Sequence, residues 1–324
     1  MNRLGLAVGM LAAALLVSVA RAETPADYPT RPVRIVVPFG PGGPADITAR
    51  LVGKFLQDRF KQPFVVDNRP GAGGVIGTVE VARAAPDGYT LLMMSNTQTA
   101  NETLLPNRNY QLMRDLVAVA PANSSDLVIV VNPAVPAKTL QELITLAKQQ
   151  PGKLNYASSG QGTPYHMAGE LFKAMTKTDI VHVPHRNSGE ARTNVIAGQV
   201  EMMIDAITTM APNIVAGQVR ALATTGKTRS TVLPDVPTVA EAGVPGYEAT
   251  IWLGFMAPAG TPPAIVAKLN AAITEVAAQP DITRMWAQQG AVPMTMSPSE
   301  FDAYLRGDIV KWHDIALKFV EKTQ

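Results

Sequence analysis

The stretch Arg34-Ile-Val-Val-Pro-Phe-Gly-Pro-Gly-Gly-Pro-Ala-Asp46 decides the fold, because a buried strand runs into a Gly/Pro loop and on into an amphipathic segment, Ile47 to Phe60. A glycine-rich turn between a strand end and a helix N-terminus exposes free backbone amides, and the helix dipole adds partial positive charge there. Both favour a negatively charged group. The stretch therefore predicts an α/β fold with an anion-binding loop over Phe39 to Asp46.

The N-terminus has the pattern of a secretion signal. Arg3 precedes an apolar run from Leu4 to Val19, and Ala20-Arg21-Ala22 fits the small-x-small cleavage pattern. The alternative is a membrane anchor, but the run of about 16 residues is short of the ~20 that span a bilayer. Without a cysteine, lipoprotein anchoring is excluded. We expect a signal peptide over residues 1–22, a mature chain that begins at Glu23, and a periplasmic location.

Composition excludes several classes of function. The chain has 28 basic and 26 acidic residues, and removal of Arg3 and Arg21 with the signal leaves 26 of each. A neutral mature chain has no general electrostatic reason to bind nucleic acid. Zero cysteines exclude disulfides and Cys-ligated zinc, and four histidines make no recognisable metal motif. No cofactor is expected, and the protein is expected to be a monomer.

Strand-like and helix-like segments alternate along the mature chain, which predicts parallel sheets covered on both faces. About 300 mature residues suit two lobes of about 150 each. Composition changes near Asn123 and over Pro234 to Pro245 suggest two crossings, giving residues 23–123 plus 246–324 as lobe 1 and 124–245 as lobe 2. The predicted strands include 33–38, 64–67, 90–94, 127–131, 155–158, 180–183, 202–204 and 219–223, and the predicted helices include 46–60, 74–84, 139–149, 163–176, 188–197, 264–279 and 299–321.

Small Gly-rich or hydroxyl-rich segments follow several predicted strands at their carboxyl ends, where ligands of such sheets bind. Their N–H and O–H groups can hold a carboxylate, and charge-assisted hydrogen bonds of this kind contribute ~1.5–3 kcal/mol each. The loops are Phe39 to Asp46, Ser95 to Thr99 and Ser158 to Thr163, and Asp205 follows a fourth strand. The predicted ligand-binding residues are Phe39, Gly40, Gly42, Gly43, Asp46, Ser95, Asn96, Thr97, Ser158, Ser159, Gly160, Gly162, Thr163, His166 and Asp205, with Arg186 added below.

Two enzymatic interpretations compete with a binding protein. Ser158 or Ser159, with His166 one turn into the next helix as base, could serve a periplasmic enzyme that acts on a carboxylate, although no G-x-S-x-G elbow is present. Gly40 to Ala45 satisfies G-x-G-x-x-A, as in a nucleotide-binding oxidoreductase. Prolines 41 and 44 remove two amides from that loop, and an exported protein is separated from the main nicotinamide pools. A receptor should return its ligand unchanged, whereas either enzyme should not.

Ordered motifs along the chain resemble one family. The segment YPTRPV (28–33), together with the stretch quoted above, is similar to the mature start of the Bug (Bordetella uptake gene) proteins. These proteins are the substrate-binding receptors of tripartite tricarboxylate transporters and are also described as TctC-like. Further agreement lies at VVDNRPGAGGVIGT (65–78), APDGYTLL (85–92), QELITLAKQQPGKLNYASSGQGT (141–163), LPDVPTVAEAGVPGYE (233–248) and WLGFMAPAGTPP (252–263).

The resemblance implies a two-lobed periplasmic binding protein of the Venus-flytrap type, with two doubly wound sheets joined by a two-crossing hinge. It implies no catalysis, and capture of a small organic carboxylate by loop amides, hydroxyls and ordered water for delivery to the transporter's membrane components. Residues 101–111 and His185-Arg186-Asn187-Ser188 depart from the family pattern. Arg186 is the cation nearest the expected cleft, and a guanidinium can hold a carboxylate with two hydrogen bonds. Which carboxylate binds stays open.

Overall fold

The computed structural model describes residues 27–320, so the predicted signal peptide and the cleavage site before Glu23 lie outside the described residues. The strands are β1 (Val33–Val37), β2 (Phe64–Asn68), β3 (Thr90–Ser95), β4 (Leu116–Val131), β5 (Asn155–Ser158), β6 (Val181–Pro184), β7 (Met202–Ala206), β8 (Arg220–Thr224), β9 (Thr250–Pro258) and β10 (Ala291–Pro293). The helices are α1 (Pro44–Phe60), η1 (Ala72–Gly74), α2 (Val75–Ala82), α3 (Asn96–Leu104), α4 (Leu112–Asp115), α5 (Leu140–Gln149), α6 (Pro164–Thr176), α7 (Ser188–Ile196), α8 (Ile207–Val215), α9 (Pro263–Ala277), α10 (Pro280–Gln288) and α11 (Pro298–Val320).

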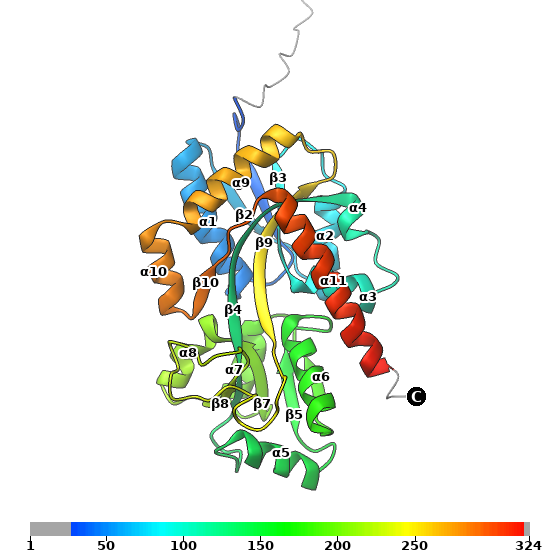
Figure 1. Cartoon of the computed structure of the whole chain (residues 1–324), viewed down its shortest axis with the longest axis vertical. Helices are drawn as coiled ribbons and strands as arrows, with labels where there is room; N and C mark the ends of the chain where they lie inside the picture. Colours follow the sequence, from blue (N-terminus) through cyan, green and yellow to red (C-terminus); the bar gives the residue numbers. More distant parts are fainter. Residues whose placement is uncertain (1–26, 321–324) are drawn as a thin grey trace, which may run out of the picture.

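Two sheets share the long strand β4, which confirms the predicted two-lobed α/β fold (Figure 1). In the first lobe β1 pairs in parallel with β2 and β3, and β9 joins β3 to the first part of β4 in antiparallel fashion. In the second lobe β5 pairs in parallel with β6 and β7, and residues 127–131 of β4 pair with β7 and β8. The chain therefore passes from the first lobe to the second within one strand.

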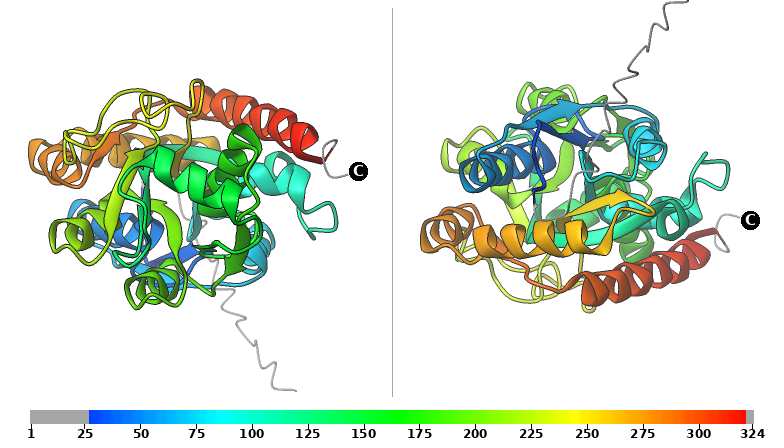
Figure 2. Two further views of the ribbon diagram at one scale, coloured as in Figure 1. Left: turned by 90° about the horizontal axis from the view of Figure 1, so that it is seen from below. Right: turned by 90° about the horizontal axis from the view of Figure 1, so that it is seen from above.

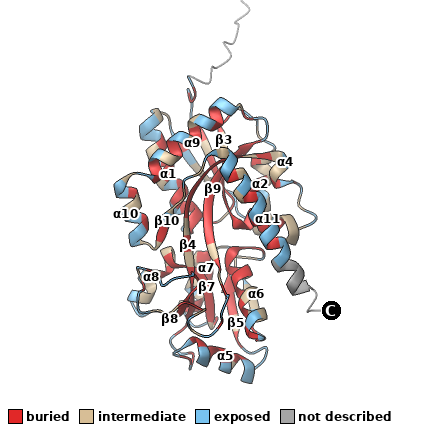
Figure 3. Cartoon of the chain, in the orientation of Figure 1, coloured by how far each residue is buried: buried red, intermediate tan, exposed pale blue. Residues whose placement is uncertain are grey.

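Both faces of each sheet are covered by helices, so central strands such as β3, β7 and β9 are buried and apolar, whereas the edge strands β2 and β6 are partly exposed. On β3, Leu91 and Met93 face the core that α1 and α9 cover, whereas Leu92 and Met94 face the core under α2 and α11. In the second lobe α5 and α6 cover one face and α7 and α8 the other. Figure 2 shows the helices around the strands from two more sides. Figure 3 shows that buried residues gather on the strands in the interior, whereas the outer faces of the helices are exposed.

Ser95 to Thr99 and Asp205 lie in other elements than predicted. Ser95 to Thr99 was expected to be a loop but begins α3, because Ser95 caps the helix and Gln98 completes a capping box with it. Asp205 was expected to follow a strand, but it lies within β7. By contrast, Thr139 caps α5 as predicted, since its hydroxyl accepts a hydrogen bond from the Glu142 amide.

Candidate functional site

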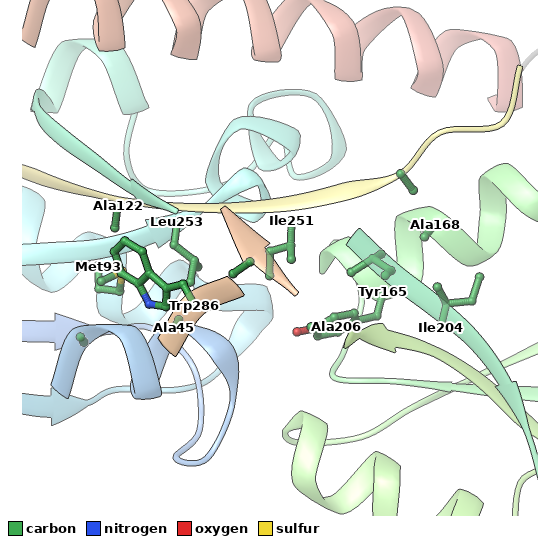
Figure 4. Close-up of a cluster of buried hydrophobic side chains, with 14 of the residues drawn as sticks. Ala45, Met93, Ala122, Tyr165, Ala168, Ile204, Ala206, Ile251, Leu253 and Trp286 are labelled. Carbon is green, nitrogen blue, oxygen red and sulfur yellow. The ribbon is translucent and has the colours of Figure 1, made fainter. Parts of the chain in front are cut away.

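A cavity of about 550 Å³ lies between the two lobes and is lined from both. Pockets of a few hundred cubic ångströms are the usual size for small-molecule sites. The first lobe contributes Pro38, Phe39, Gly40, Pro41, Gly43, Pro44, Ala45, Pro70, Gly71, Ala72, Gly73, Gly74, Ser95, Ile251 and Leu253; the second contributes Ser159, Gly160, Thr163, Pro164, Tyr165, His185, Arg186, Asn187 and Ser188. The buried apolar cluster beside it is continuous between the lobes and includes Ile251 and Leu253 of β9 and Tyr165 of α6 (Figure 4).

The N-terminus of α1 forms one wall of this cavity. Gly43 is the N-cap and provides no side-chain cap, Pro44 occupies the first turn, and the first intrahelical bond is from the Ile47 amide to the Gly43 carbonyl. The amides of Ala45 and Asp46 therefore have no intrahelical acceptor, as in the first turn of any α-helix. This end of the helix offers N–H groups and a positive dipole to the cavity.

The Asp46 carboxylate organises the first loop from behind. It accepts a hydrogen bond from the Gly42 amide at 3.0 Å and forms an ion pair with Arg50 at 2.9 Å. Burial alone would raise the pKa of Asp46, but the hydrogen bonds from Arg50 and Gly42 outweigh burial and hold the pKa below its usual value. The Asp46 carboxylate thus fixes the loop, and its side chain does not line the cavity.

The loop before α6 forms a wall from the second lobe. The Thr163 hydroxyl donates to the Gly160 carbonyl at 2.7 Å, and the Gly160 amide donates to Ser158 Oγ at 3.1 Å. Thr163 is the N-cap of α6, and its side chain caps no amide of the helix. The first amides of α6 are therefore left for a ligand, in the same manner as those of α1.

Two more helix N-termini reach the cavity. Ser95, the N-cap of α3, lines it from the first lobe, and Asn187 and Ser188, the N-cap and first residue of α7, line it from the second. Next to them Arg186 has an exposed side chain. Four positive helix ends and one arginine therefore surround a single cavity, and this field favours an anion.

Glycines allow the two lobes to meet beside the cavity. A Cβ atom placed on Gly40 would lie 2.7 Å from Cβ of Asn187, and one placed on Gly73 would lie 2.8 Å from the Gln161 carbonyl oxygen. Each pair joins the first lobe to the second. Real Cβ atoms do not approach other atoms this closely, so the lobes could not meet this tightly with side chains at Gly40 and Gly73.

A compact polar cluster lies behind the loop of the second lobe. Ser158 Oγ is 2.6 Å from Nε2 of His182, and the rings of His182 and His166 are 4.2 Å apart. Burial lowers the pKa of both histidines, that of His182 to about 4. The sequence paired Ser158 or Ser159 with His166, and the structure instead places Ser158 beside His182. His166 Nδ1 accepts a hydrogen bond from the Gly162 amide. Ser158 is 0% exposed, so its hydroxyl is closed to a substrate.

Asp205 forms a buried ion pair that the sequence did not reveal. Nε of Arg192 donates to Asp205 Oδ2 at 3.0 Å, and Asp205 is fully buried. Burial raises the pKa of Asp205 despite the arginine. Asp205 and Arg192 contribute to the electrostatic environment of Tyr165, which lines the cavity.

The predicted site residues divide evenly between the cavity lining and its surroundings. Those that line it are Phe39, Gly40, Gly43, Ser95, Ser159, Gly160, Thr163 and Arg186, and those that do not are Gly42, Asp46, Asn96, Thr97, Ser158, Gly162, His166 and Asp205. The largest unpredicted contribution is residues 70–74, a Gly-rich turn after β2. Phe39 to Asp46 was predicted because it is a glycine-rich turn between a strand and a helix, and the same criterion applies to residues 70–74.

Within residues 27–320, no three His, Asp or Glu side chains are placed so that they could hold a metal ion. No helix in the same range is long and apolar enough to cross a membrane.

Comparisons with known proteins agree with this geometry. Residues 48–319 match the family described as "Tripartite tricarboxylate transporter family receptor". The chain is 38% identical over 315 residues to Protein BugT of Bordetella pertussis, with 96% of each chain covered. It is similar to the solved structure of R. palustris Rpa4515 with adipate, with a TM-score of 0.88, 34% identity and coverage of 90% of this chain and 98% of that one. MatC from Rhodopseudomonas palustris with bound malate gives a TM-score of 0.85 and 34% identity, with 89% and 99% covered. The chain therefore belongs to the tripartite tricarboxylate transporter family of receptors, as its resemblance to the Bug proteins predicts.

Proposed function

We propose that this chain is a periplasmic receptor that binds a small organic carboxylate and delivers it to the membrane components of a tripartite tricarboxylate transporter. The observation that carries the proposal is the convergence of four helix N-termini, from both lobes, on one cavity of about 550 Å³. The uncapped first amides of α1 and α6, together with the dipoles of all four helices, stabilise a carboxylate without a formal cation. The adipate and malate that the two similar structures hold are both small carboxylates.

Binding between lobes supports a mechanism of closure. A ligand that contacts Gly43 of the first lobe and Thr163 of the second has a higher affinity for the closed arrangement than for an open one, so it shifts the equilibrium toward closure. The continuous strand β4 and the strand β9, which runs antiparallel beside it, are the connections about which such a movement would occur. The transporter would then recognise the closed, loaded receptor.

The same geometry argues against the two enzymatic alternatives. Ser158 has a histidine partner but no access to the cavity, and Ser159, which lines the cavity, has no recorded histidine contact within the described residues. The first loop carries Pro41 and Pro44, which cannot donate to a pyrophosphate. A non-catalytic receptor fits these features.

Ligand recovery with thermal unfolding tests the proposal. At a ligand concentration of about 100 Kd, binding adds ~2.7 kcal/mol of apparent stability. This should raise Tm by roughly 4 °C, since an unfolding entropy of ~2.1 cal/mol/K per residue over about 300 residues makes each kcal/mol worth about 1.6 °C. The panel contains dicarboxylates, tricarboxylates and aromatic acids, with nicotinamide dinucleotides as the rival class. A carboxylate should stabilise the protein and be recovered unchanged after prolonged incubation. Conversion of the carboxylate, or stabilisation by dinucleotides alone, would contradict the receptor.

A further inference from the structure

The polar side chains that line the cavity are mostly engaged with the protein itself. The Ser95 hydroxyl donates to Thr97 Oγ1 at 3.0 Å, and the Thr163 hydroxyl donates to the Gly160 carbonyl. Both ring nitrogens of His185 are within 3.0 Å of protein atoms, the Val183 carbonyl oxygen and the Asn194 amide nitrogen. Among the described lining residues, the Ser159 hydroxyl and the Asn187 side-chain nitrogen have no recorded hydrogen bond, so hydroxyl groups on a ligand would find few side chains with which to exchange hydrogen bonds.

The cavity also lacks a carboxylate. Among the residues that the structure describes, no Asp or Glu lines it, and the nearby Asp46 carboxylate is committed to Gly42 and Arg50. The available groups are N–H donors: the first amides of α1, α6 and α7, and a guanidinium. An ammonium group placed here would lose its water and gain no carboxylate as a counter-charge, which is unfavourable in a buried site.

The rest of the lining is apolar. It consists of glycines, five prolines, Ala45, Ala72, Phe39, Tyr165, Ile251 and Leu253. Proline has no N–H, so these walls offer contact surface without donors. At ≈30 Å³ per water, about 550 Å³ corresponds to roughly 18 water volumes, which accommodates a six-carbon diacid with a few bridging waters.

Arg186 is the one arginine or lysine among the described lining residues. Its backbone amide donates to Glu190, but the structure records no partner for its guanidinium among residues 27–320. A guanidinium at a cavity otherwise supplied with amide donors provides a second, separate position for a carboxylate.

We infer that the ligand is a dicarboxylate with an unsubstituted apolar body, one carboxylate held by the helix N-termini and the other by Arg186. This rests on the proposed function and narrows it: amino acids and hydroxy acids such as citrate and malate are disfavoured. The discrimination arises because their ammonium and hydroxyl groups would be buried without partners.

Calorimetric titration of the mature protein with matched ligand pairs tests the inference. Glutarate should bind at least a hundredfold more tightly than glutamate, which adds an ammonium group. Succinate should bind about tenfold more tightly than malate, which adds a hydroxyl. Adipate should bind at least tenfold more tightly than hexanoate, which lacks the second carboxylate. Glutamate or malate binding as tightly as its partner would overturn the apolar-body inference while leaving a carboxylate receptor in place.

The Arg186→Ala variant tests whether Arg186 binds the second carboxylate of the ligand. The variant should lose far more affinity for adipate than for hexanoate, so the adipate-to-hexanoate ratio falls to below about threefold. Arg284→Ala, an exposed arginine on α10, is the control and should leave the ratio unchanged. An Arg186→Ala ratio equal to that of the control would exclude Arg186 as the second anchor. Absence of binding by every carboxylate in both titrations would instead refute the proposed function.

Discussion

Gly40→Ala should weaken ligand binding without unfolding the protein. Gly40 lies in the first loop and faces Asn187 at the start of α7 across the cleft. An added Cβ would lie 2.7 Å from Cβ and 3.3 Å from Cγ of Asn187. The backbone of Gly40 is outside the left-handed region, so alanine can adopt it without strain. The added methyl group therefore affects only the arrangement in which the lobes meet.

The size of the effect follows from the clash. Overpacking of this kind costs about 1–3 kcal/mol, and the cost applies to the closed state only. Because ligand affinity depends on the population of the competent state, Kd should rise about 5- to 150-fold. Without ligand the Tm should stay within about 1 °C, since the open form contains no clash.

Calorimetry and small-angle scattering measure the two consequences. Affinity should fall by the factor above, and the ligand-induced decrease in radius of gyration should need correspondingly more ligand. Asn187→Gly in the same chain removes the opposing Cβ and should restore most of the affinity, since glycine is nearly as good an N-cap as asparagine. Unaltered affinity in Gly40→Ala, or a double variant as weak as the single one, would refute closure through this contact.

Three further predictions concern other parts of the chain. Burial, reinforced by Glu248, raises the pKa of Asp126 to about 6. Its ionisation therefore opposes folding; the loss of stability is absent below pH ~4 and complete above pH ~6. Asp126→Asn should stabilise the protein by roughly 1–2 kcal/mol at pH 7, allowing for partial exposure. It should also flatten the dependence on pH, between pH 4 and 7, of the unfolding free energy measured in urea. An unchanged pH dependence would contradict the raised pKa of Asp126. Arg192→Met should cost about 3–5 kcal/mol in urea unfolding by leaving Asp205 charged and buried, with partial recovery on adding Asp205→Asn, whereas a loss below 1 kcal/mol would contradict the pair's role. N-terminal sequencing of exported protein should begin at Glu23, and retention of Met1 in the membrane fraction would contradict the signal peptide.

Local chemistry made much of the first lobe predictable. The Gly/Pro loop before α1 was predicted because glycine-rich turns and a proline in the first helical turn have specific backbone requirements. The strand β4 was recognised only over 127–131, because Pro121 and the polar residues after it are typical of a loop. In the structure the ladder shifts register between Pro121 and Asn123, where a proline is tolerated within a strand.

The contacts between distant segments were not predictable from one sequence. Ser158 meets His182 because β5 and β6 pair in parallel with Ser158 opposite Pro184, a register that no local pattern specifies. The buried pair of Arg192 and Asp205 likewise depends on how α7 packs on β7. Sequence patterns located loops that line the cavity. The residues that hydrogen-bond to Ser158 and Asp205 outside the cavity could be identified only from the three-dimensional structure.

The most direct test of the account is mass spectrometry of the small molecule released by denaturing protein freshly purified from the periplasm. We expect close to one equivalent per chain of an unmodified organic acid with two carboxylates and an apolar body. A carboxylic acid of another kind would support the receptor and contradict only the ligand class inferred from Arg186 and the apolar walls. Stoichiometric release of a nucleotide, a neutral sugar or an amine would contradict the central claim that this cavity captures carboxylates.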